Sequence, residues 1–129
     1  MLPDRRGNNR IDTLRNIVRD PRISLLFLVP GVGRTLRING RAVIRIDAEL
    51  RDTFKIQDKV SRSVIVVTAE RVYTQCPRAL IRSNLWDPRK HLDESAFPSQ
   101  GIMMKTIQES FPAEEWDRTY AERVSKTMY

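Results

Sequence analysis

The stretch from Thr35 to Asp47 constrains the fold most strongly, because apolar and polar residues alternate along it almost without a break. A period of two is typical of a β-strand with one face in a core and the other in water. Gly40 falls on the apolar side, where a missing side chain predicts a bulge or a sharp bend of the kind that closes barrels. Arg37 and Arg41 give the other face a basic character.

Two elements are predicted before this strand. Apolar residues recur on one helical face over about residues 10–19, with Asn9 as N-cap and Asp12 completing a capping box. Asp20-Pro21 ends that helix, because the residue before a proline is pushed out of helical geometry. Residues 23–29 are almost continuously apolar, which predicts a strand buried on both faces, one against the core and one against a second subunit.

The elements after it are more varied. Residues 63–75 form a long expected strand whose alternation slips near Glu70-Arg71, which predicts a second bend. Asp47 is placed to cap a short helix, and Cys76-Pro77 begins another. The remainder is expected to comprise a surface loop over residues 86–98 and amphipathic helices over 102–110 and 113–126.

Three long strands joined by short turns and helices predict an α+β fold around a curved antiparallel sheet. We expect one domain over residues 1–129, with a barrel part (1–85) and a part made of a loop and C-terminal helices (86–129). Three strands alone close poorly into a barrel. Either another chain supplies the missing edge, or sequence that would complete the barrel is absent.

The net charge of +7 indicates an anionic partner. The arginines are scattered among acids and few aromatic residues accompany them, so nucleic acid ranks last among the candidate partners. The longest apolar run, Leu25 to Val29, is far too short to span a membrane, and the N-terminus lacks the apolar centre of a secretion signal. A cytoplasmic protein is expected, in agreement with the single cysteine, Cys76.

The sequence offers little for acid–base, nucleophilic or metal chemistry. Its one histidine, His91, and its one cysteine, Cys76, cannot assemble a zinc site, so we expect no metal. No serine nucleophile elbow occurs. Gly31-Val32-Gly33 leads into a strand and lacks a third glycine, which favours a hairpin turn over a nucleotide-binding loop. Catalytic residues therefore stay unassigned.

Anion binding is better supported. Arginines at positions 5, 6 and 10 flank a Gly-Asn-Asn turn before the first helix, and Thr13 adds a hydroxyl. Backbone amides at a helix start, together with guanidinium groups, are suited to a phosphate ester. Arg37 and Arg41 project from one face of the following strand, within reach of the same phosphate or of a partner subunit. The alternative, that these arginines only pair with surface acids, has equal weight from spacing alone.

Several blocks resemble a known family. They are residues 4–17 (DRRGNNRIDTLRNI), 20–22 (DPR), 25–31 (LLFLVPG) and 35–42 (TLRINGRA), and the later pieces 75–79 and 82–86 resemble one bacterial subgroup of probable FMN-dependent enzymes in that family. Together they resemble the pyridoxamine 5'-phosphate oxidase class of FMN-binding split β-barrels. The resemblance implies a homodimer with FMN at the subunit interface. Members of the class usually have an upstream segment that contributes the first barrel strands beside the flavin ring, and this chain starts just before the phosphate loop.

Carried onto this sequence, the resemblance implies cofactor-binding side chains near the helix start, on the neighbouring strand and at a strand end. They are Asn9, Arg10, Thr13, Arg34, Thr35, Arg37, Gln75 and Arg78. The flavin ring performs the redox chemistry in such enzymes, so no catalytic acid or base need appear in the protein. The sequence thus predicts an FMN-dependent oxidoreductase acting on a small-molecule substrate. The alternative is a flavin-free dimeric binding protein that retains a partial barrel.

Overall fold

The structure is a computed structural model that describes residues 1–5, 7 and 10–128. Contacts within the chain divide it into two compact units, Met1–Trp86 and Asp87–Met128, called here the β-unit and the helical unit. The β-unit carries a net charge of +9 and the rest of the chain −2, which together give the +7 of the whole.

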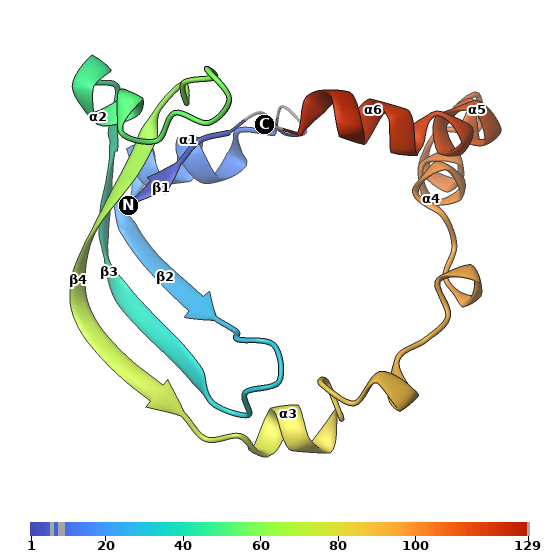
Figure 1. The fold of residues 1–129 in the computed structure, drawn as a ribbon, viewed down its shortest axis with the longest axis horizontal. Helices are drawn as coiled ribbons and strands as arrows, with labels where there is room; N and C mark the ends of the chain where they lie inside the picture. Colours follow the sequence, from blue (N-terminus) through green and yellow to red (C-terminus); the bar gives the residue numbers. More distant parts are fainter. Residues whose placement is uncertain (6, 8–9, 129) are drawn as a thin grey trace. The chain divides into compact units, whose positions relative to one another are not determined.

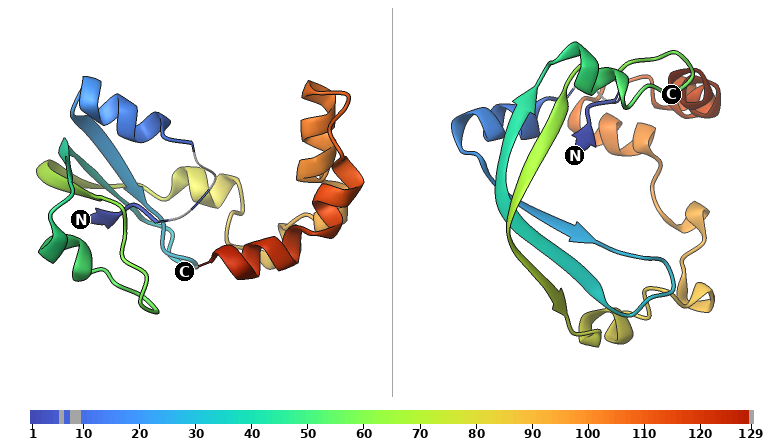
Figure 2. Two further views of the ribbon diagram at one scale, coloured as in Figure 1. Left: turned by 90° about the horizontal axis from the view of Figure 1, so that it is seen from above. Right: turned by 60° about the vertical axis from the view of Figure 1, so that its left-hand side comes forward.

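The β-unit is a curled antiparallel sheet with short helices at its ends (Figures 1 and 2). Its strands lie in the order β1-β4-β3-β2. In chain order its elements are β1 (Leu2–Pro3), α1 (Asp12–Arg19), β2 (Arg22–Phe27), β3 (Thr35–Arg45), α2 (Ala48–Asp52), β4 (Val64–Gln75) and α3 (Arg78–Arg82). The predicted α+β class and curved antiparallel sheet are confirmed, as an incomplete split barrel of four strands. The fourth, β1, was missed because two residues are too few to show a period.

The curl of the sheet has an identifiable cause in the pairing of β3 with β4. Their register shifts between Asn39 and Gly40, so that Asn39 pairs with Arg71 while Gly40 pairs with Ala69 and Glu70 is the extra residue. A Cβ at Gly40 would lie 2.0 Å from the carbonyl oxygen of Thr68. The two predicted irregularities, at Gly40 and at Glu70-Arg71, are therefore the two sides of one bulge.

Packing in the β-unit concentrates where α1 crosses β3. Ile17 of α1, Ala42 of β3 and Val64 of β4 are its buried apolar residues. The predicted helix cap is wrong: α1 begins at Asp12 with Ile11 at the N-cap position and no side-chain cap, and Asn9 lies outside the described residues. Asp47 precedes α2 as expected, but it accepts hydrogen bonds from Arg45 instead of capping the helix.

The sequence predicted that β2 is buried on both faces, but within a single chain β2 is only partly buried. Alternate residues of β2 are half-buried, and Leu26, Phe27, Leu28 and Val29 are each 41–54% exposed. The structure contains a single chain, so the face assigned to a second subunit has no cover in it. This part of the prediction stays open.

The helical unit contains two 3₁₀ turns, η1 (Pro88–Lys90) and η2 (Glu94–Ala96), followed by α4 (Gln100–Ile107), α5 (Ala113–Arg118) and α6 (Tyr120–Thr127). The helix predicted over 113–126 is thus divided at Thr119. Trp116 organises this unit, with its ring 5.3 Å from that of Phe111 and 3.6 Å from the Arg123 guanidinium carbon. Within the described residues, no helix is long and apolar enough to cross a membrane.

Candidate functional site

Five of the predicted binding residues gather at one end of the β3–β4 ladder. Thr35 pairs with Gln75 across the strands, and Arg37 donates a hydrogen bond from Nε to the Gln75 side-chain oxygen. Arg34 directly precedes β3, and Arg78 begins α3, with two residues between it and the end of β4. Thr35 is buried and Arg37 is half-buried, whereas the other three are exposed. Guanidinium and amide groups are therefore accessible at this end of the sheet, where Thr35 itself is buried.

The turn before β3 is held against the segment that follows β4. The indole nitrogen of Trp86 donates to the carbonyl oxygen of Val32 at 2.9 Å. A Cβ on Gly33 would lie 3.4 Å from the Cβ of Pro77, so these two backbones approach closely. Gly31 adopts φ +79°, a conformation that glycine reaches without a steric penalty. These contacts fix Arg34 and Arg78 on neighbouring segments.

Of the three remaining predicted residues, Asn9 lies outside the described residues, and Arg10 and Thr13 lie at the opposite end of β3. Thr13 is an exposed residue of α1, and Arg10, also exposed, lies two positions before the first residue of that helix. A small apolar hollow lined by Leu14, Val18 and Ile44 places α1 near the end of β3. Nine residues separate Thr35 from Ile44, roughly 30 Å along an extended strand. Within one chain the predicted set is therefore divided, as the positions of α1 and α3 also show (Figure 1).

The arginines of the N-terminal turn have different fates. The Arg5 guanidinium donates to the carbonyl oxygen of Phe54 at 2.7 Å, so this residue ties the turn to the segment after α2. Arg6 lies outside the described residues. Arg41 stands on β3, and its charge helps the hydrogen-bonded Arg22 to lower the pKa of Asp20 to about 2.

The alternative that surface acids neutralise the arginines holds for only part of the set. Arg22 pairs with Asp20 and Arg45 with Asp47. Arg34, Arg37, Arg41 and Arg78 take part in none of the ion pairs that the described residues form. Their charge is available to an anion.

A polar groove of about 660 Å³ crosses the middle of the sheet on the face that carries Arg37. We define it by Ser24, Arg37, Asn39, Glu70, Arg71 and Tyr73, which come from β2, β3 and β4. Except for Arg37, none of these was predicted as a binding residue. The signal that unites them is the cross-strand register, Ser24 opposite Asn39 and Asn39 opposite Arg71, which a single sequence does not display.

A comparison with family models matches residues 1–76 to the family described as Pyridoxamine 5'-phosphate oxidase. The chain belongs to this family. No curated protein and no solved structure matches the chain. The matched pyridoxamine 5'-phosphate oxidase region runs from β1 through the end of β4, so it includes Thr35, Arg37 and Gln75 and stops before Arg78. The part of the chain that the structure describes contains no group of three or more His, Cys, Asp or Glu residues able to hold a metal ion.

Proposed function

We propose that the protein is an FMN-dependent oxidoreductase of the pyridoxamine 5'-phosphate oxidase class that acts on a small-molecule substrate. The observation that carries this proposal is the family match over the entire sheet. The charge distribution agrees with it, because the matched unit carries the whole positive excess of the chain. An anionic cofactor is favoured in such a field.

The side chains suit the phosphate of FMN. Arg34 and Arg78 are exposed guanidiniums without an ion-pair partner among the described residues, and Thr35, which follows Arg34 in the chain, adds a hydroxyl. Guanidinium and hydroxyl groups recognise a phosphate monoester through charge-assisted hydrogen bonds. Bound FMN would supply the electron transfer, while the protein binds and orients it.

A homodimer resolves the division of the set, and we propose it as the functional assembly. Arg10 and Thr13 belong to the α1 region, which packs near the end of β3, whereas Thr35 is at its start. The three residues are therefore too far apart to hold one phosphate within a protomer. A two-fold axis can bring the α1 end of one protomer to the β3 start of its partner, because such an interface uses each surface twice. The exposed apolar residues at the end of β2 supply surface for the contact.

The colour of the purified protein is the first test. A yellow preparation that releases FMN, or a colourless one that binds added FMN, supports the proposal. A colourless protein that refuses FMN contradicts it and favours the flavin-free dimeric binding protein. Arg10→Ala and Arg34→Ala should each weaken FMN binding by about tenfold or more, whereas Arg62→Ala, which removes an exposed arginine elsewhere, should not.

Mixing the two variants tests whether the site is shared between protomers. In a mixed dimer of Arg10→Ala and Arg34→Ala, one of the two shared sites keeps both arginines. Random exchange would then restore tight FMN binding at about one quarter of all sites. A site built within one protomer gives no restoration, because every copy retains its defect. FMN titration of each variant and of the exchanged mixture distinguishes the two results.

A further inference from the structure

The hydrogen-bonding groups of the polar groove are unevenly used. The Ser24 hydroxyl donates to the Asn39 side-chain oxygen at 2.8 Å, which occupies that oxygen and leaves the amide NH₂ as a donor. Arg37 uses Nε for Gln75 and retains its terminal nitrogens. Arg71 and Tyr73 make no side-chain hydrogen bond to any described residue and Arg71 no ion pair, so both keep their donors. Apart from the Glu70 carboxylate, the groove is therefore richer in unused donors than in unused acceptors.

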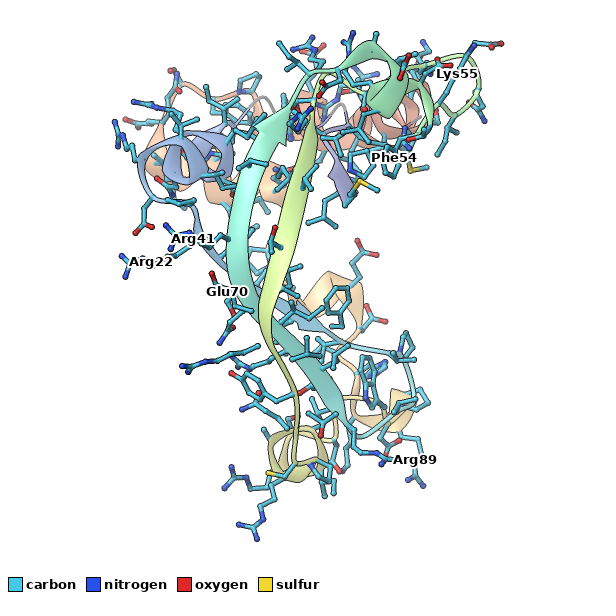
Figure 3. All side chains as sticks on the ribbon, turned by 90° about the vertical axis from the view of Figure 1, so that its left-hand side faces the viewer. Arg22, Arg41, Phe54, Lys55, Glu70 and Arg89 are labelled. Atoms are coloured by element: carbon cyan, nitrogen blue, oxygen red, sulfur yellow. The ribbon has the colours of Figure 1, made fainter. Side chains whose placement is uncertain are left out.

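The charges of the groove have the same bias. At its margin, Asp20 accepts from the Arg22 guanidinium at 2.9 and 3.0 Å, so this acid is neutralised in place. The other charged residues that line the groove are Arg37, Arg71 and Glu70, and none of them takes part in an ion pair between described residues. Glu70 is the extra residue of the β4 bulge, and Figure 3 shows it on the same side of the β3–β4 ribbon as Arg22 and Arg41. The groove keeps a net positive charge with one acid at its edge.

We propose that the polar groove binds a small oxyanion-bearing molecule, through Arg37, Asn39, Arg71 and Tyr73. An oxyanion supplies only acceptors, which complements a surface that offers donors. The volume of about 660 Å³ falls in the range of small-molecule sites. A nucleic-acid strand fits less well, because it needs several aromatic side chains to stack its bases and this groove has one. Arg37 is shared with the predicted cofactor-binding set, whereas Asn39, Arg71 and Tyr73 lie outside that set, and the proposal does not rest on the proposed FMN function.

Glu70 allows a test in which two substitutions in the groove change anion affinity in opposite directions. Removing a guanidinium from the groove must weaken anion binding, whereas removing the Glu70 charge must strengthen it, because a like charge repels the ligand. A general attraction to the basic β-unit would treat every arginine alike. Arg62 provides the matched control, since Arg62→Gln changes the net charge as Arg71→Gln does, at an exposed position outside the groove.

The experiment is calorimetric titration of the purified full chain with inorganic phosphate and, separately, with citrate at low salt. We expect Arg71→Gln to weaken binding about tenfold, Glu70→Gln to tighten it about two- to fivefold, and Arg62→Gln to leave it unchanged. Stronger binding of phosphate identifies a phosphate-bearing ligand, and stronger binding of citrate a carboxylate-bearing one. Circular dichroism verifies that each variant is folded.

Three outcomes overturn the proposal. Neither anion binds the parent protein, or Arg62→Gln weakens binding as much as Arg71→Gln, or Arg71→Gln weakens FMN binding as much as anion binding. The last result would make the groove part of the cofactor site. Failure of FMN binding in the parent protein contradicts the proposed function alone, because phosphate and citrate report on the groove without the cofactor.

Discussion

At Gly40 the backbone of β3 lies close against the backbone of β4. An added Cβ would lie 2.0 Å from the Thr68 carbonyl oxygen and 3.2 Å from the Ala69 Cα, both backbone atoms of the paired strand. We expect Gly40→Ala to lower the free energy of unfolding by about 3 kcal/mol, because the ladder must separate to admit the methyl group. Gly33→Ala is the control and should change it by less than about 0.5 kcal/mol. Urea unfolding measures both, and equal effects would contradict a bulge packed this tightly.

Asp20 carries the clearest pH signature. Hydrogen bonds from the Arg22 side chain and backbone lower its pKa from 3.8 to about 2, although the carboxylate is exposed. A lowered pKa in the folded state means that the pair's contribution to stability is present above pH 4 and is lost as the pH falls toward 2. We expect the Asp20 carboxyl carbon to titrate near 2 by NMR, and near its ordinary value in Arg22→Gln. An unchanged midpoint in that variant would contradict the assigned cause.

At the scale of elements, Asp117 joins α4 to α5. Its carboxylate accepts from the Gly101 backbone N–H at 2.9 Å and from the Ser99 hydroxyl, and Ser99 in turn caps α4 by accepting from the Ile102 N–H. Gly101 is buried against α5, where a Cβ would lie 2.5 Å from the Ala113 carbonyl oxygen. One carboxylate thus satisfies donors at the start of α4 that no helical partner can satisfy.

Removing that carboxylate should loosen the start of α4. We expect Asp117→Ala to lower the free energy of unfolding by about 1–2 kcal/mol. It should also speed hydrogen exchange of the Gly101 amide by about tenfold or more. Asp117→Asn should have an intermediate effect, because its side chain keeps one acceptor. Glu115→Ala, an exposed acid of the same helix, should leave that amide unchanged. Hydrogen exchange followed by NMR measures the protection of the Gly101 amide in each of the three variants. Equal protection of Gly101 in all of them would show that its stability comes from packing alone.

Periodicity and proline placement predicted most elements, because they are properties of a short stretch of chain. The long strands and the helix after Cys76-Pro77 follow from such local patterns. Helix starts were less predictable. Asn9 and Asp12 match the sequence pattern of a capping box, yet the helix begins after Ile11. Several starts satisfy the same residue pattern, and packing of α1 on β3 selects among them. Likewise, the sequence predicted irregularities at Gly40 and at Glu70, but only the strand register shows that they form one bulge.

At the scale of the whole molecule, the sheet separates groups that are near one another in sequence. Arg37 was expected to reach either the phosphate at Arg10 or a partner subunit. The antiparallel sheet sets Arg37 beside Gln75 of β4, while α1 packs at the far end of β3, so Arg37 and Arg10 lie apart within one chain. Residues that meet across strands are distant in sequence. The polar groove that contains Asn39, Arg71 and Tyr73 could therefore be recognised only from the pairing of β3 with β4.

The same scale governs the exposed apolar end of β2. Leu28 and Val29 are 45% and 54% exposed and continue an apolar run, a surface that a second copy would cover. We expect the parent protein to sediment as a dimer, and Leu28→Asp to raise the dissociation constant by at least about tenfold, because a charge would be buried without a partner. Leu92→Asp places the same charge at a leucine that is 78% exposed in the helical unit and should leave the dimer intact. Sedimentation equilibrium decides: a monomeric parent protein would remove the shared cofactor site, whereas a dimer weakened equally by both variants would place the interface elsewhere.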